Sequence, residues 1–186
     1  MNVYEHCPEY QNDAFRLCLI SMEHCDDLLQ VYSDPKAVPF FNGDNCNGDD
    51  FHYTTRERMA QAIEFWQWSY REGWFVRWSI LDQTTGQAIG TIELFHRDAE
   101  DVYDQTGVLR LDLRSDYEKQ QAIGQILSLI LPDAFDLFYC RAILTKCVPA
   151  AAERQQALSQ LGFQPSPEPM YGHDGTAYFD YYKLEQ

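Results

Sequence analysis

Three runs of alternating apolar and polar residues constrain the fold more than any other feature of the sequence. WFVRWSILD (74–82) and QAIGTIELFHR (87–97) are joined by a short turn that contains glycine, which predicts a β-hairpin. TGVLRLDLR (106–114) continues the pattern and predicts a further strand. Because side chains alternate between the two faces of a strand, Arg110 and Asp112 should share one face and the leucines of this run the other.

Helical periodicity and further strand patterns occupy the rest of the chain. The predicted elements are a strand at 15–20, a helix that starts at Ser21, a helix at 54–73, a helix at 117–138 that Pro132 can kink, a strand at 141–148, a helix at 150–163 and a strand at 176–184. The long polar loop at 34–54 is expected to lie beside a substrate. The order β α α β β β α β α β indicates a single domain over residues 1–186, of the α/β or mixed α+β class.

The charge of the chain limits its partners. Fourteen Lys and Arg against 29 Asp and Glu give a formal net charge of -15 at pH 7. This charge opposes non-specific attraction to nucleic acid or to an anionic membrane, and it favours basic or amine-bearing partners. Acidity that serves only solubility is the alternative.

The cysteines and the apolar runs indicate the compartment. The six cysteines form no C-x-x-C pair and show no zinc-type spacing with the five histidines, so we expect reduced thiols and no metal site. No apolar run approaches the roughly 18 residues needed to span a bilayer, and the N-terminal residues lack the pattern of a secretory signal. A cytoplasmic protein is expected.

Four segments together resemble the GNAT superfamily of acyl-CoA-dependent N-acyltransferases, especially its ribosomal-protein-alanine acetyltransferase branch. They are FRLCLI with the acidic helix and DPKAV after it, GQAIGTIEL, LRLDLRSDYEKQQAIGQIL, and the ending ALSQLGF. The resemblance implies a central, twisted, mostly antiparallel sheet with a splayed parallel strand pair and helices on both faces. It also implies transfer of an acetyl group from acetyl-CoA to an amine, either of a small molecule or of a protein N-terminus; homodimer formation is an open option.

In this family, backbone N–H groups at a helix N-terminus bind the pyrophosphate of coenzyme A. The segment YEKQQAIGQIL (117–127) lies at the corresponding place, with Ala122 where the family has a glycine. The alternative is that Ser115 or Asp116 caps an ordinary core helix. By resemblance, the coenzyme-binding residues are Leu111 and Leu113 along the pantetheine arm, with the Leu111 N–H at the thioester oxygen, and Lys119, Gln120, Gln121, Ala122, Ile123 and Gly124 at the pyrophosphate.

Acetyl transfer to an amine needs a base, and a carboxylate within a strand is a candidate because burial raises its pKa. Glu93 is the first candidate and Asp112 the second. The alternatives are structural ion pairs, of Glu93 with Arg77 across the hairpin and of Asp112 with Arg110 on the same strand face. His96, at a strand end, is a weaker candidate, and a solvated histidine is the alternative.

The proton donor that many relatives carry is missing from the sequence. Leu158 and Ala151 stand where relatives have a tyrosine and an asparagine in the last helix, and Ser159 is a substitute candidate for the tyrosine. These departures favour an alternative function, a catalytically inactive binding or regulatory protein with the same fold. A third hypothesis, an unrelated α/β enzyme with Cys147 as nucleophile, lacks a histidine placed near that residue.

Two aromatic runs, FWQWSY (65–70) and AYFDYY (177–182), are predicted to pack in the core. Trp66, Trp68 and Tyr70 belong to the first of them. If either run lined a pocket, a cationic amine such as a polyamine or an amino sugar would stack on its rings.

Overall fold

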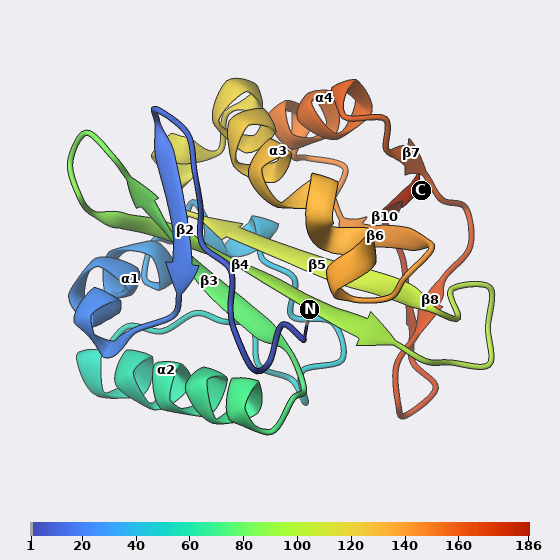
Figure 1. Cartoon of the computed structure of the whole chain (residues 1–186), viewed down its shortest axis with the longest axis horizontal. Helices are drawn as coiled ribbons and strands as arrows, with labels where there is room; N and C mark the ends of the chain where they lie inside the picture. Colours follow the sequence, from blue (N-terminus) through green and yellow to red (C-terminus); the bar gives the residue numbers. More distant parts are fainter. Residues whose placement is uncertain (1) are drawn as a thin grey trace.

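The computed structural model describes residues 2–186 and is built on an eight-stranded sheet with the strand order β1-β2-β3-β4-β5-β6-β10-β7 (Figure 1). Neighbouring strands run antiparallel except β5 and β6, which are parallel. The strands are β1 Tyr10–Gln11, β2 Phe15–Leu19, β3 Val76–Asp82, β4 Ala88–Arg97, β5 Thr106–Leu113, β6 Ala142–Lys146, β7 Gln164–Pro165 and β10 Tyr181–Glu185, while β8 Met170–Tyr171 and β9 Ala177–Tyr178 form a separate two-stranded sheet. The helices are α1 Cys25–Tyr32, α2 Arg56–Arg71, α3 Gln120–Leu137 and α4 Ala152–Gln160, with 3-10 turns η1 Met22–His24, η2 Val38–Phe40 and η3 Ser115–Tyr117.

Helices cover both faces of the sheet. Figure 1 shows α3 and α4 on one side and α1 and α2 on the other. Each side has its own hydrophobic cluster: the leucines of β5 pack with Ile123 and Ile126 of α3, whereas Leu28 of α1 packs with Met59 and Trp66 of α2. The predicted class is confirmed, a mixed α/β fold with a mostly antiparallel sheet and one parallel strand pair.

The alternation in β5 separates an apolar face from a charged face. Leu109, Leu111 and Leu113 belong to the cluster under α3. Asp112 faces the other side, where it accepts a hydrogen bond from Tyr32 of α1. Because all eight residues of β5 are buried, the strand carries charged side chains into the interior of the protein.

Three predicted features differ from the structure. The third long helix begins at Gln120 and not at Tyr117, because the residues before it form η3. The helix is continuous through Pro132, so it does not restart there. The predicted C-terminal strand is divided into β9 and β10, because Asp180 adopts a positive φ of 67° that interrupts the extended backbone.

The aromatic run of α2 divides between the core and the surface. Trp66 is 2% exposed, as predicted, but Trp68 is 39% exposed, so the prediction that it packs in the core is wrong. Successive residues of an α-helix are rotated by about 100° around its axis, so Trp66 and Trp68, which are two residues apart, lie on nearly opposite faces of α2. In the C-terminal run, Tyr181 is buried as predicted.

The state of the cysteines and the character of the helices bear on the expected compartment. All six cysteines are free thiols in the structure. Within residues 2–186, no helix combines the length and the apolar character that a membrane crossing requires.

Two glycine-to-alanine substitutions should change stability in opposite directions. A Cβ at Gly90 of β4 would overlap the carbonyl oxygen of Asp112 on β5, so Gly90→Ala should lower the free energy of unfolding by about 1–3 kcal/mol. A Cβ at Gly124 of α3 would meet nothing within 4 Å, so Gly124→Ala should raise it by about 0.5–1 kcal/mol through helix propensity. Urea unfolding measures both, and an unchanged Gly90→Ala variant would contradict the β4–β5 register.

Candidate functional site

The parallel strands β5 and β6 part beyond the middle of β5. Their pairing extends from Thr106 opposite Ala142 to Leu109 opposite Thr145. Beyond this point β5 continues to Leu113 in register with β4. The chain continues from these strands into α3 and α4, and the first turns of the two helices are joined by a hydrogen bond from Gln120 to Glu153. This opening is the place at which the resemblance puts the coenzyme, and we call it the cleft.

A side chain of α4 fills the cleft. Arg154 is 3% exposed, and its Nη1 donates a hydrogen bond to the carbonyl oxygen of Leu111 at 2.9 Å. Its Nε and Nη2 donate to the two carboxylate oxygens of Glu118, each at 2.7 Å. Burial by itself would lower the pKa of Arg154, but the Glu118 carboxylate raises it overall, so the guanidinium stays charged. One backbone group of the strand predicted to contact the pantetheine arm, the Leu111 carbonyl, is therefore bonded to a side chain of the protein.

A carboxylate from α4 caps the N-terminus of α3. The helix begins at Gln120, and the side chain of its N-cap residue, Lys119, makes no capping bond. The Gln120 N–H instead donates to Oε2 of Glu153 at 2.7 Å. Glu153 takes the capping role that the alternative interpretation gave to Ser115 or Asp116, although it is 33 residues away in the sequence.

The other residues predicted at the pyrophosphate lie along the first turns of α3. The Ile123 N–H donates to the Lys119 carbonyl oxygen at 2.9 Å. Gly124 lies one residue further into the helix, where each N–H bonds to the carbonyl four residues earlier. The amides of Gln121 and Ala122 remain as first-turn donors at this helix end.

In the arrangement described, the Glu153 carboxylate occupies the place at the head of α3 where the resemblance puts a diphosphate group. Glu118 and Glu153 place two carboxylates at the head of α3, and the guanidinium of Arg154 is paired with Glu118. A unit negative charge about 4 Å from one carboxylate is repelled by roughly 4 kcal/mol at an effective dielectric constant of 20. The attraction of a helix N-terminus for an anion is about 0.3–1 kcal/mol and reaches about 2 kcal/mol in favourable sites. Repulsion is the larger of these two terms while the Glu153 carboxylate accepts from the Gln120 N–H.

The loop before α2 contacts the same strands and β10. The carboxylate of Asp44 accepts hydrogen bonds from Nζ of Lys146 at 2.7 and 2.6 Å and from the hydroxyl of Tyr181 at 3.0 Å. The Asp44 carbonyl oxygen accepts from Nη2 of Arg110 at 3.0 Å. The loop predicted to lie beside a substrate is thus tied to β5, β6 and β10 by charged groups.

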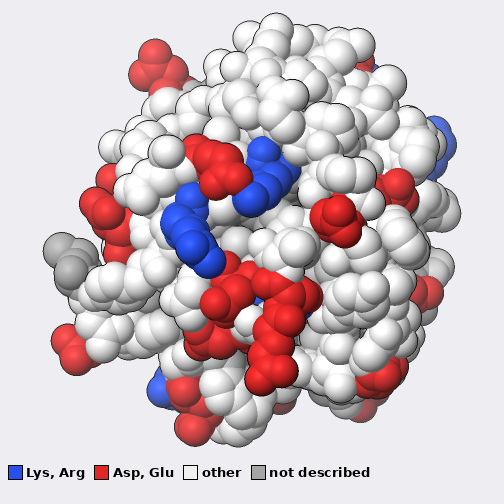
Figure 2. Space-filling model, turned by 90° about the vertical axis from the view of Figure 1, so that its right-hand side faces the viewer, with Lys and Arg blue, Asp and Glu red and all other residues white. Residues whose placement is uncertain are grey.

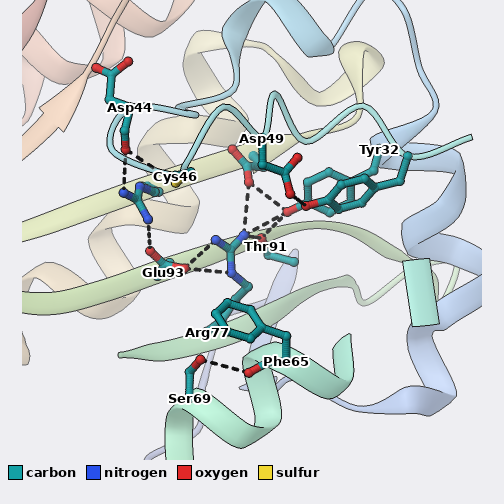
Figure 3. A network of polar contacts seen from close by, with 12 residues as sticks. Tyr32, Asp44, Cys46, Asp49, Phe65, Ser69, Arg77, Thr91 and Glu93 are labelled. Atoms are coloured by element: carbon teal, nitrogen blue, oxygen red, sulfur yellow. Dashed lines mark hydrogen bonds and ion pairs between the residues drawn. The ribbon is translucent and has the colours of Figure 1, made fainter. Parts of the chain in front are cut away.

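The two predicted catalytic carboxylates, Glu93 and Asp112, belong to one buried ionic network, part of which Figure 3 shows. Arg77 of β3 binds Glu93 at 2.5 Å and Asp112 at 3.1 Å, and Arg110 of β5 binds the other oxygen of Glu93 at 2.6 Å. The predicted pair of Glu93 with Arg77 is confirmed. The predicted pair of Asp112 with Arg110 is wrong, because Arg110 lies opposite Glu93 in the β4–β5 register and Asp112 lies opposite Thr91.

The ionisation of Glu93 follows from this network. Burial alone would raise its pKa, but the charges and hydrogen bonds of Arg77 and Arg110 outweigh burial, and the pKa lies below its usual value. The predicted direction of this shift is therefore wrong. A carboxylate that two guanidinium groups hold in the charged form is a poor proton acceptor. The Asp112 Oδ2 accepts hydrogen bonds from both Tyr32 and Arg77.

The other residues considered for catalysis are His96, Ser159 and Cys147. The Nδ1 of His96 lies 2.7 Å from the Phe138 carbonyl oxygen, and its Nε2 lies 3.2 Å from the carboxylate of Asp98. Leu158 is packed in the core, and Ser159 is exposed to solvent. Burial raises the pKa of the Cys147 thiol to about 11, which keeps it protonated at neutral pH. Within residues 2–186, no group of three or more His, Cys, Asp or Glu side chains is placed to hold a metal ion.

Sequence reasoning missed the charged residues that close the cleft, Glu118, Glu153 and Arg154. Their partners lie 33 to 43 residues away, so local patterns do not reveal them. One signal was available: Arg154 shares a helix face with Ala157 and Leu158 at spacings of three and four residues. That face is buried, which predicts a buried arginine that needs a partner.

Removing the charge of Glu93 should destabilise the protein in a pH-dependent way. The pKa of Glu93 is lower in the folded state, so its stabilising effect is present above the unfolded-state pKa, about 4.3, and is lost as the pH falls through the folded-state value. We expect Glu93→Gln to lose about 3 kcal/mol at pH 7, and the difference from the wild type to shrink below about pH 4. Urea unfolding across this pH range checks it, with Glu9→Gln, from a half-exposed surface pair with Arg16, as the control. A difference that is constant with pH would contradict the charged pair.

Comparison with known proteins identifies the family. The family model described as an acetyltransferase (GNAT) domain matches residues 16–164. No curated protein matches the chain. A GNAT-family acetyltransferase from Bacillus anthracis is similar in structure with a TM-score of 0.69 and 10% identity, covering 96% of this chain and 98% of the other. A ribosomal-protein alanine acetyltransferase from Vibrio fischeri has a TM-score of 0.64 and 14% identity over 96% of each chain.

A third similar structure was determined with coenzyme A bound to that protein. A ribosomal-protein alpha-N-acetyltransferase in complex with coenzyme A has a TM-score of 0.68 and 14% identity, covering 94% of this chain and 95% of the other. At these identities the three structures share the fold of this chain, while the family match spans most of its length. The chain therefore belongs to the GNAT acetyltransferase domain family.

Proposed function

We propose that this chain is a binding or regulatory protein that keeps the acetyltransferase fold and does not use coenzyme A. One observation carries the proposal: the positions expected for the pyrophosphate and for the pantetheine arm are taken by Glu153 and Arg154. Both side chains come from the first turn of α4, so a single helix closes both parts of the cleft.

Opening the cleft is costly because the closing groups are charged and buried. A pantetheine arm at Leu111 must displace Arg154, which would leave the Glu118 carboxylate buried without its partner. Breaking a buried ion pair in this way costs about 3–5 kcal/mol. Coenzyme binding would have to supply that free energy in addition to overcoming the repulsion by Glu153.

The carboxylates expected to act as bases have a structural role in this proposal. Glu93 and Asp112 neutralise Arg77, which joins β3 to β4 and β5. The lowered pKa of Glu93 suits an ion pair better than a proton acceptor. The free thiols suit a reducing compartment, so we place the protein in the cytoplasm.

The second candidate function is acetyl transfer from acetyl-CoA to an amine of a small molecule or of a protein N-terminus. The family match favours it, and the ribosomal-protein acetyltransferases among the similar structures favour a protein N-terminus as acceptor. It requires Glu153 and Arg154 to leave the cleft, and it requires an acid other than Leu158.

Thermal unfolding with coenzyme A separates the two functions. A ligand at 100 times its dissociation constant stabilises the folded state by about 2.7 kcal/mol, which raises Tm by several degrees in a chain of this size. We expect no rise for the wild type at about 1 mM coenzyme A. We expect a rise for Glu118→Gln/Glu153→Gln, which removes both carboxylates and frees Arg154 to bind phosphate.

The matched control is Glu57→Gln/Glu64→Gln, which removes two exposed carboxylates from α2 and should behave as the wild type. A coenzyme-induced rise in the wild-type Tm, together with thiol release from acetyl-CoA when an amine or an N-terminal peptide is added, would support the second candidate and overturn the first.

A further inference from the structure

Large aromatic rings lie side by side on the outer surface of α2 and the segment after it. Phe65, Trp68 and Trp74 are 49%, 39% and 53% exposed. The ring centroids of Trp68 and Trp74 are 4.5 Å apart in an edge-to-face arrangement, and those of Phe65 and Trp68 are 6.0 Å apart. We call these three residues the aromatic surface. A single exposed ring is ordinary, but a row of three rings in which Trp68 contacts both Phe65 and Trp74 is a contiguous apolar patch of the kind found at interaction sites.

One end of the aromatic surface opens into an acidic groove. The groove has a volume of about 900 Å³ and lies between the β4–β5 connection and β8. Trp74 lines it together with Phe95, Tyr171, Asp98 and Glu100. Figure 2 shows the end of the molecule that is on the right in Figure 1, where acidic side chains gather around the middle of the view.

The acidic side chains of the groove outnumber the basic side chains that are free to pair with them. Asp101 also lines it, but its carboxylate binds Arg97 at 2.6 Å, and the lining Arg110 binds Glu93. Asp98 is 75% exposed at its side chain, and its nearest ionisable partner is a histidine. Glu100 is exposed, and among residues 2–186 it makes no ion pair. The groove therefore offers negative charge beside aromatic faces.

We propose that the aromatic surface and the acidic groove together bind a basic, amphipathic segment of a partner protein. Its lysine or arginine side chains lie in the groove against Asp98 and Glu100, and one of them stacks on the face of Trp74. Its apolar side chains cover Phe65 and Trp68. This surface uses none of the cleft residues, and Arg110 is its one lining residue that also belongs to the ionic network, so the proposal stands whether or not the chain transfers acyl groups.

Charge complementarity favours a basic protein segment over a second copy of this chain, nucleic acid or an anionic membrane. The net charge of -15 repels a second copy of the chain, and it also repels nucleic acid and anionic lipid. A basic protein segment gains from the field of the whole molecule and from the local carboxylates. The aromatic surface then supplies the apolar contact that distinguishes an amphipathic segment from a merely cationic one.

A designed peptide tests the proposal directly. The probe is a helical peptide of about 14 residues made only of leucine and lysine, and its binding is followed by tryptophan fluorescence and calorimetry at about 0.15 M salt. We expect saturable binding at micromolar concentrations. Trp68→Ala/Trp74→Ala and Asp98→Lys/Glu100→Lys should each weaken it at least tenfold, and a peptide with glutamate in place of lysine should not bind.

Two matched controls separate the surface from general attraction. Asp13→Lys/Glu23→Lys reverses two exposed acidic charges elsewhere, and Tyr139→Ala removes a ring that is 74% exposed outside the surface. Both should bind the peptide within about twofold of the wild type, and circular dichroism should show every variant folded. Equal weakening by the two charge reversals would overturn the proposal in favour of net charge alone.

The oligomeric state of the protein, measured by sedimentation velocity, tests whether the aromatic surface is an interface between two copies of the chain. We expect a monomer at all accessible concentrations. A dimer that Trp68→Ala/Trp74→Ala dissociates would overturn the proposal, because the aromatic surface would then be an interface between two copies of this chain.

Discussion

The buried pair of Arg77 and Glu93 is the interaction on which the centre of the sheet depends. Removing an ion from water costs several kcal/mol, so every charge in this interior needs a partner. Glu93 therefore recruits Arg110 from β5, and Arg77 recruits Asp112 from the same strand. Arg110 also binds the backbone of Asp44, in the loop before α2. One pairing requirement joins three strands and that loop.

The same requirement explains how the cleft is closed. A strand that leaves its partner exposes backbone carbonyl groups, and these must be bonded when they are buried. Arg154 satisfies the Leu111 carbonyl, and its own charge is satisfied by Glu118. The head of α3 has the complementary need for an acceptor, which Glu153 supplies. Two groups at the predicted coenzyme site, the Leu111 carbonyl and the Gln120 N–H, therefore have partners within the chain.

The exposed aromatic rings of α2 and the segment after it differ in their surroundings from the buried ring of Trp66. Trp68 and Trp74 are partly exposed to solvent, and Trp74 lines the groove that also contains Asp98 and Glu100. The ionic network, by contrast, is shielded by α1 and α2, where the Trp66 ring lies 4.1 Å from the Arg77 guanidinium. α2 thus presents two aromatic faces, one that stabilises buried charge and one that is available for binding.

Local patterns were enough to predict the longer helices and strands of this protein, but not the two-residue strands β1, β7 and β8. The hairpin, the alternation of β5 and the long helices were recognised because apolar periodicity and turn residues act over a few positions. The resemblance of the segments then predicted the parted parallel strands. The pairing of Asp112 was predicted wrongly, because it depends on which residue lies opposite in the β4–β5 register. The closing of the cleft by Arg154 was missed, because the carbonyl and carboxylate that it binds are distant in sequence. The sequence by itself determined the order of elements and hence the acetyltransferase fold; only the tertiary structure decided which charges meet, because register and helix packing bring distant residues together.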